Sequence, residues 1–267
     1  MKKDTAVVNG IEMRYARFGT GKKNLLIIAG ISLTDVVDSA PSVARMYRRF
    51  TNDYTVYLFG RRSNPPGRYS LKEMANDLKT VLDFLGIAQA DITGVSQGGM
   101  IAMILASLYP ESVGRLILTS TSACRNEASD RIMRQWVRLS ESTDNEALVR
   151  SMIEGIYAPN TIEKYGEMFV EMNRNLTAQE RKLFEIIATS LLDFDLRSYL
   201  PSIQAKTLVV GCKGDRALGV EPSVYLAEAL SAKLVVFGEE YGHAVYDEAP
   251  DYLDCVFDFL HEENDAP

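Results

Sequence analysis

The stretch DITGVSQGGMIAM, residues 91–103, decides the fold, because a short apolar run gives way to helical periodicity within it. Residues 91–95 have the length and composition of a buried strand, and residues 100–108 carry apolar side chains at helical spacing. The motif Gly94-x-Ser96-x-Gly98 therefore spans a strand-to-helix turn. Since small neighbours let a strand and a helix approach closely, we predict a strained turn that presents the Ser96 hydroxyl. The alternative is a glycine-rich bend with a solvated serine.

The rest of the chain repeats this alternation of strand and helix. Short apolar runs without polar alternation, typical of parallel strands covered on both faces, lie at residues 25–29, 55–59, 116–119, 207–211 and 234–237. Helical periodicity marks residues 71–85 and 252–260, and Asn9-Gly10 predicts an opening β-hairpin. The pattern predicts the α/β class, with a mostly parallel central sheet and helices on both faces.

The alternation breaks between about Cys124 and Pro201, where every periodic stretch is helical. We interpret this segment as an insertion between two strands, whose apolar faces would pack over the carboxyl ends of the strands. The predicted division is a core of residues 1–122 and 201–267 and a helical cap, or lid, of residues 123–200.

Composition excludes several classes of function. The net charge is -7 and no long Lys/Arg block is present, which disfavours a nucleic acid partner. No segment approaches the ~18 apolar residues of a membrane span, and the N-terminus lacks the apolar core of a signal peptide, so we expect a cytoplasmic protein. The three cysteines are widely spaced and show no metal-binding pattern, so we expect them to be structural.

A serine hydroxyl becomes an effective nucleophile only when a base removes its proton, and histidine is the usual base near neutral pH. The chain has two histidines. His243 follows the last predicted strand in a loop next to Gly242, whereas His261 lies in the charged C-terminal segment. The position of His243 after a strand end makes it the predicted base.

The base needs a carboxylate that orients its imidazole ring. Asp215 lies directly beyond the penultimate predicted strand and is the predicted partner, although Lys213-Gly214-Asp215 could also be an ordinary turn. Glu239, Glu240 and Asp247 are alternatives because they are close to His243 in the sequence.

The order Ser96, Asp215, His243, with each residue just past a strand, resembles the α/β-hydrolase superfamily over nearly the whole chain. The resemblance implies that Ser96 is the nucleophile, His243 the general base and Asp215 the orienting carboxylate. It also implies an oxyanion hole formed by the backbone N–H groups of Gln97 and Ile31. No metal or organic cofactor is implied.

Two segments depart from the commonest family pattern. Ala29-Gly30 stands where many members have His-Gly, and Gly30 keeps the room that the backbone needs. The segment FGRRSNPPGRYS, residues 59–70, differs from the familiar Asp-x-Arg-Gly-x-Gly-x-Ser form. The resemblance therefore implies the family but no particular subfamily.

We predict a carboxylesterase-like serine hydrolase that cleaves an ester or related acyl bond of a small, apolar substrate through an acyl-serine intermediate. A C–C bond hydrolase, thioesterase, aminopeptidase or acyltransferase could use the same three residues, and a non-catalytic ligand receptor could use the same fold. A homodimer is compatible with all of these. The large side chains of the inserted segment are candidates for an apolar pocket, although such spacing is also typical of ordinary core: Met133, Trp136, Met152, Tyr157, Phe169, Met172 and Phe194.

Overall fold

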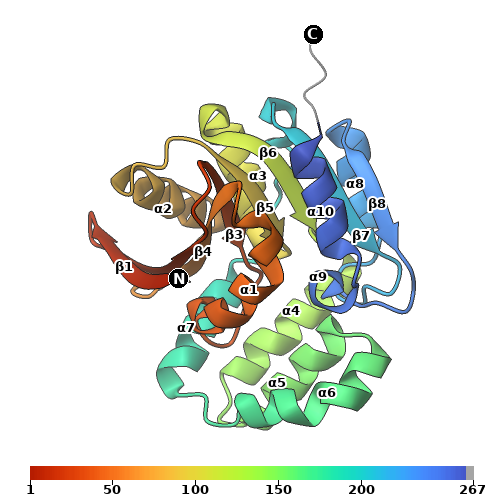
Figure 1. The fold of residues 1–267 in the computed structure, drawn as a ribbon. Helices are drawn as coiled ribbons and strands as arrows, with labels where there is room; N and C mark the ends of the chain where they lie inside the picture. The colour runs from red at the N-terminus through yellow and green to blue at the C-terminus, as the bar shows by residue number, and fades with distance from the viewer. Residues whose placement is uncertain (263–267) are drawn as a thin grey trace.

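The computed structural model describes residues 1–262, which form one eight-stranded sheet with helices on both faces (Figure 1). The strands are β1 (Lys2–Val8), β2 (Ile11–Phe18), β3 (Lys23–Ile28), β4 (Tyr54–Arg62), β5 (Ala90–Val95), β6 (Val113–Thr119), β7 (Lys206–Cys212) and β8 (Lys233–Phe237). Their order across the sheet is β1-β2-β4-β3-β5-β6-β7-β8. The pairs β1–β2 and β2–β4 are antiparallel, and the other neighbouring pairs are parallel. The predicted mostly parallel sheet is confirmed.

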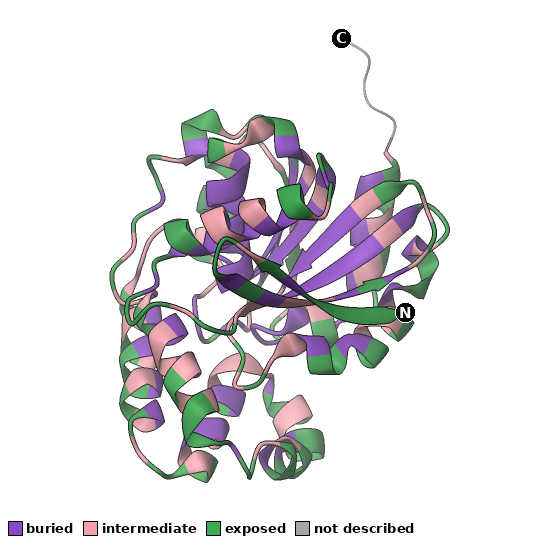
Figure 2. Ribbon diagram, turned by 90° about the vertical axis from the view of Figure 1, so that its left-hand side faces the viewer, coloured by how far each residue is buried: buried purple, intermediate pink, exposed green. Residues whose placement is uncertain are grey.

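The opening hairpin forms because its turn residues tolerate positive φ. Asn9 has φ 50° and Gly10 has φ 76°, the left-handed conformations that a two-residue type I′ turn requires at both central positions. Lys2 pairs with Arg17 at one end of the ladder and Val8 pairs with Ile11 at the other. The hairpin lies at the edge of the sheet, and most of β1 is exposed to solvent (Figure 2).

The central strands bury both of their faces, as their continuous apolar sequence predicts. Leu25 and Leu26 point to opposite sides of the sheet, and both are fully buried. Leu26 packs in the core layer that includes α2 (Leu71–Phe84), α3 (Gln97–Leu108) and α8 (Glu221–Ala229). Leu25 packs in the opposite layer, which includes α1 (Ala40–Met46), α9 (Val245–Glu248) and α10 (Tyr252–His261).

Four helices lie between β6 and β7 in the sequence: α4 (Glu127–Ser140), α5 (Asn145–Ile156), α6 (Pro159–Met172) and α7 (Ala178–Thr189). We call them the inserted helices. Figure 1 shows them grouped together below the sheet, beside α9. Capping boxes begin α4 at Asn126 and α7 at Thr177, and Pro159 begins α6. Their helical character agrees with the sequence pattern, whereas the division of the chain at residues 123 and 200 stays a prediction.

The structure differs from the sequence prediction at several places, among them α8 and α9, for which we predicted no element. Helix α3 begins at Gln97, three residues earlier than its apolar spacing indicated, because Gly98 and Gly99 lie in its first turn. Residues 36–50, for which we predicted no element, form α1 flanked by two short 3-10 helices. Within residues 1–262, no helix is long and apolar enough to cross a membrane.

Candidate active site

Ser96 lies on the turn between β5 and α3 in a conformation that non-glycine residues rarely adopt. Its φ is 52° and its ψ is -121°, a region whose strain typically costs about 1–3 kcal/mol. The surrounding backbone holds it there. The Ser96 N–H donates to the Thr119 carbonyl at 2.9 Å, and the Thr121 hydroxyl donates to the Ser96 carbonyl at 2.7 Å. The hydroxyl is thereby presented at the carboxyl end of the sheet.

Three glycines flank this turn because there is no room for a side chain. A Cβ atom on Gly98 would lie 1.9 Å from the Ile28 carbonyl oxygen, and one on Gly94 would lie 2.7 Å from the Gly98 carbonyl oxygen. A Cβ atom on Gly30 would lie 3.2 Å from that of Ser96. The first two contacts are with backbone atoms, which cannot shift without a large cost in free energy. Glycine at positions 94 and 98 is therefore what allows β3, β5 and α3 to approach each other this closely.

His243 and Asp215 form a buried pair beyond the ends of β8 and β7. The distance between His243 Nδ1 and Asp215 Oδ2 is 2.7 Å, and the two side chains are 7% and 1% exposed. The other carboxylate oxygen, Oδ1, accepts from the N–H groups of Ala217 and Leu218 at 2.8 and 2.9 Å. With the carboxylate as acceptor, we infer that the proton sits on Nδ1 and leaves Nε2 free to accept another.

The loop that carries His243 is anchored to the end of α5. The Ala244 N–H donates to the Ile156 carbonyl at 3.0 Å, and a Cβ atom on Gly242 would lie 2.7 Å from that same oxygen. Glu248 joins the two segments, because its carboxylate accepts from the N–H groups of Gly242 and Ala158 at 2.5 and 2.9 Å. The position of the imidazole is therefore coupled to the inserted helices.

None of the alternative carboxylates forms a hydrogen bond or an ion pair with His243 among the described residues. Asp247 accepts from the Tyr157 hydroxyl at 3.4 Å, and burial raises the pKa of this carboxyl above its ordinary value. Glu239 and Glu240 are exposed. The structure thus brings only Asp215, of the four candidates, to the imidazole.

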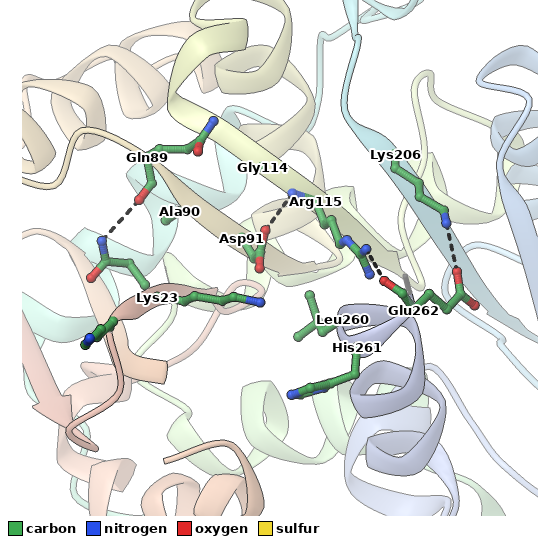
Figure 3. A pocket seen from close by; sticks show the side chains of 12 residues that line it. Lys23, Gln89, Ala90, Asp91, Gly114, Arg115, Lys206, Leu260, His261 and Glu262 are labelled. Carbon is green, nitrogen blue, oxygen red and sulfur yellow. Dashed lines mark hydrogen bonds and ion pairs between the residues drawn. The ribbon is translucent and has the colours of Figure 1, made fainter. Parts of the chain in front are cut away.

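His261, the other histidine, lies far from the strand ends that carry Ser96 and His243. It is the last residue of α10, and it lines a pocket at the amino ends of the parallel strands (Figure 3). Its Nδ1 contacts the Phe257 carbonyl at 2.8 Å, and its Nε2 contacts Asp53 at 3.2 Å. The remainder of the charged C-terminal segment, residues 263–267, lies outside the described residues.

Ser96 and His243 line one pocket together with Ile31. No hydrogen bond joins Ser96 to His243 among the described residues. Hydrogen bonds between catalytic side chains are often long or poorly aligned in free enzymes. The remaining walls come from the strand ends and from the inserted helices and the segments that follow them. They are mainly apolar and include Met100, Met133, Trp136, Ile156, Leu191, Phe194, Leu218 and Tyr246.

The pocket uses three of the seven side chains suggested by the sequence, namely Met133, Trp136 and Phe194. The other four have different environments. Met152 is buried in the core, Tyr157 and Phe169 stack on each other with ring centroids 4.8 Å apart, and Met172 is 73% exposed. Helical periodicity identifies an apolar face, but it does not tell whether that face meets another helix, a cavity or solvent.

Two backbone donors are free beside Ser96. The N–H groups of Gln97 and Ile31 donate no hydrogen bond to any residue between 1 and 262. For Gln97 this follows from its place at the start of α3, where helical N–H groups have no partner within the helix. Such free donors next to a nucleophile can stabilise a developing negative charge.

Sequence reasoning missed Arg61, which lies near the carboxyl end of β4 and bonds to the Gln97 side chain. Its charge at the end of a buried strand was the available signal.

The cysteines are all unpaired, and burial raises the pKa of the Cys212 thiol to about 11. Among residues 1–262, no three His, Cys, Asp or Glu side chains gather as a metal site would require.

Comparison with known proteins gives relatives over most of the chain. "3-oxoadipate enol-lactonase 2" of Acinetobacter baylyi is 24% identical over 230 residues, which cover 85% of this chain and 84% of the relative. "Putative carbamate hydrolase RutD" of Pseudomonas savastanoi is 27% identical over 223 residues, which cover 80% and 86%.

Solved structures share the fold. An alpha/beta hydrolase enzyme from a Medee basin deep-sea metagenome library superimposes with a TM-score of 0.87 at 22% identity and 99% coverage of both chains. The enol-lactonase of Burkholderia xenovorans has a TM-score of 0.83 at 22% identity and covers 97% of this chain and 100% of its own. The model of the alpha/beta hydrolase fold family matches residues 39–250, and the chain therefore belongs to that family.

Proposed function

We propose that the protein hydrolyses an ester, including a cyclic ester, of a small and mainly apolar substrate through an acyl-serine intermediate at Ser96. The observation that carries the proposal is the pocket itself. The strained, half-buried Ser96 lines the same pocket as His243, whose Nδ1 is 2.7 Å from a buried carboxylate. Two relatives support an ester or acyl bond as the target, since one is named a lactonase and the other a carbamate hydrolase.

In the proposed first half-reaction, the Ser96 oxygen attacks the substrate carbonyl carbon while His243 Nε2 takes the hydroxyl proton. The carbonyl oxygen becomes an oxyanion that accepts hydrogen bonds from the N–H groups of Gln97 and Ile31. Collapse of this tetrahedral species breaks the bond to the leaving oxygen, which receives the proton from His243. In a cyclic ester, the leaving alcohol stays attached to the acyl group.

In the second half-reaction, His243 takes a proton from water, and the resulting hydroxide attacks the acyl-serine. The bond to Ser96 breaks, and His243 returns the proton to the serine oxygen. Asp215 keeps the imidazole in the required tautomer and stabilises its cationic form in both halves. Its buried, doubly hydrogen-bonded position fits that role.

The apolar walls favour an acyl or alcohol group without charge. Trp136 and Met133 reach the pocket from α4, and Phe194 reaches it from the segment after α7. Burial keeps the pKa of the Tyr246 hydroxyl well above its ordinary value, so Tyr246 is a neutral wall of the pocket at physiological pH. We therefore expect short apolar esters to be cleaved faster than charged ones.

A substrate panel tests the proposal. Short-chain p-nitrophenyl esters, five- and six-membered lactones, thioesters, carbamates and aminoacyl arylamides are incubated with the wild-type protein and with Ser96→Ala. We expect turnover of esters or lactones that Ser96→Ala abolishes. Turnover that persists in Ser96→Ala would overturn the assignment of the nucleophile. Ser96-dependent cleavage of thioesters or arylamides alone would replace the ester as the target bond.

A further inference from the structure

One guanidinium group touches both segments that would supply the oxyanion donors. Arg61 Nη2 donates to the Ala29 carbonyl at 2.6 Å and to Gln97 Oε1 at 3.1 Å, and Nε donates to the same Oε1 at 3.2 Å. Ala29 begins the segment that leads through Gly30 to Ile31, and Gln97 directly follows Ser96. A single side chain from β4 thus bridges the loop after β3 and the turn after β5.

The Gln97 side chain has a complete set of partners. It is fully buried, and its oxygen accepts both bonds from Arg61. Its amide nitrogen donates to the Ile187 carbonyl and to Ser190 Oγ, each at 3.2 Å. Because arginine can only donate, the orientation of the amide is settled without ambiguity. A buried amide with every partner in place is held rigidly, and so is the backbone of Gln97, whose N–H donates no hydrogen bond to any residue between 1 and 262.

The setting of Arg61 differs from that of its neighbour Arg62. The hydrogen bonds of Arg62 go to Asn64, to the Gly10 carbonyl and to the carboxylate of Asp77, away from Ser96. Those of Arg61 go only to neutral acceptors, and burial lowers the pKa of its guanidinium to about 10. A partly buried cation without a carboxylate in its hydrogen bonds is costly for the fold, which suggests that it serves the site.

We propose that Arg61 is a positioning residue that holds the N–H groups of Ile31 and Gln97 where the reaction's oxyanion forms. This inference rests on the proposed function. Through Ala29, Arg61 fixes the peptide plane that precedes Gly30, and through the amide of Gln97 it fixes the start of α3. Because these donors act on charge that develops only in the transition state, their misplacement lowers kcat and leaves KM nearly unchanged.

The test compares Arg61→Met and Arg61→Lys with Arg62→Met as the matched control from the same strand end. For each variant we would measure kcat and KM on the best ester, and the rate at which a fluorophosphonate labels Ser96. The phosphoryl oxygen of that reagent occupies the same donors as an oxyanion, so this rate reports on the donors without requiring the natural substrate.

We expect Arg61→Met to lower both kcat and the labelling rate by about 10²-fold, in the range for loss of one oxyanion donor. KM should change less than about threefold, since ground-state contacts are kept. Arg61→Lys should have a kcat and a labelling rate between those of wild type and Arg61→Met, because an ammonium group cannot span both acceptors with the guanidinium geometry. Arg62→Met should stay within about threefold of wild type in both measurements.

The proposal is overturned if Arg61→Met keeps the wild-type kcat and labelling rate, or if it raises KM alone. Should Arg61→Met fail to fold, Arg61→Lys and Gln97→Leu decide instead, and each must lower kcat without raising KM. Failure of the proposed function looks different, because the wild-type protein would then either not be labelled at Ser96 or be labelled there without cleaving any ester or lactone. A wild-type protein that is labelled at Ser96 and cleaves esters, together with an unaffected Arg61→Met, would refute the positioning role and leave the proposed function standing.

Discussion

Two histidine–aspartate pairs lie at opposite ends of the same sheet and differ in almost everything except composition. His243 and Asp215 are 2.7 Å apart and almost fully buried. His261 and Asp53 are 3.2 Å apart, with side chains 30% and 53% exposed. The pairing of an imidazole with a carboxylate therefore does not by itself single out the pair that we propose to be catalytic. Burial, a strained serine and free backbone donors distinguish the first pair.

The surroundings of the second pair explain why it is expected to be inert. It lies beside a pocket in which Lys206 pairs with Glu262 and the backbone N–H of Arg115 donates to the Asp91 carboxylate, as Figure 3 shows. The His261 ring stacks on Phe257 with centroids 3.9 Å apart, as part of the packing of α10. No strained serine or cysteine lines this pocket within the part of the chain that the structure describes.

The largest expected effect comes from removing the hydroxyl that only the first pair can use. Ser96→Ala should lower ester turnover by about 10⁴-fold or more, to the level that binding and the backbone donors alone support. Thermal unfolding should change little, because Ala keeps the Cβ atom and the turn. Steady-state assays and calorimetry on the same preparation would check both expectations. Residual activity near the wild-type level would mean that another nucleophile operates.

Matched substitutions in the two carboxylates test the comparison itself. Asp215→Asn should lower kcat by about 10³- to 10⁴-fold, because an amide in this place favours the wrong imidazole tautomer. Asp53→Asn makes the same chemical change at the other end of the sheet and should leave kcat within about twofold of wild type, since nothing there touches Ser96. An equal loss of kcat in the two variants would show that the two histidine–aspartate pairs do not differ in their effect on the reaction.

The close packing behind Ser96 gives a stability effect of intermediate size. In Gly98→Ala, the new Cβ atom would meet the Ile28 carbonyl oxygen at 1.9 Å, so we expect a loss of about 3 kcal/mol or more in the free energy of unfolding. Gly67→Ala is the control, because a Cβ atom there meets nothing within 4 Å. Denaturant titration of both variants measures the difference. Equal stability of the two would show that β3 and α3 are not packed as described.

The smallest effect is expected for His261→Ala. The contact with Asp53 is exposed, and even a charged pair on the surface contributes only about 0–1 kcal/mol to stability. Loss of the ring stacked on Phe257 adds a packing contribution of similar size. We expect a fall in Tm of a few degrees with kcat unchanged. A kcat that drops with His261→Ala as it does with His243→Ala would place both histidines in the reaction.

Much of the arrangement could be predicted because it depends on local pattern. Parallel strands read as unbroken apolar runs, and residues just past their ends meet at one edge of the sheet. The structure accordingly has Ser96, Asp215 and His243 beyond β5, β7 and β8. Their role in catalysis stays a prediction that the experiments above decide.

What could not be predicted depends on contacts between distant segments. The Gln97 side chain reaches Arg61, 36 residues away, and Ile187, 90 residues away. No periodicity encodes such pairs, so the sequence suggested only the backbone N–H of Gln97. Residues 36–50 were missed for a related reason, since short 3-10 and α segments lack enough turns to show a pattern.

The central claim is that Ser96 reacts with the help of the buried pair and without the exposed one. The most direct measurement is mass-spectrometric mapping of a fluorophosphonate label, with its rate determined in wild type, His243→Ala and His261→Ala. We predict a single label at Ser96, slowed about 10³-fold or more in His243→Ala and unchanged in His261→Ala. A label on another residue, or labelling of His243→Ala at the wild-type rate, would contradict the claim.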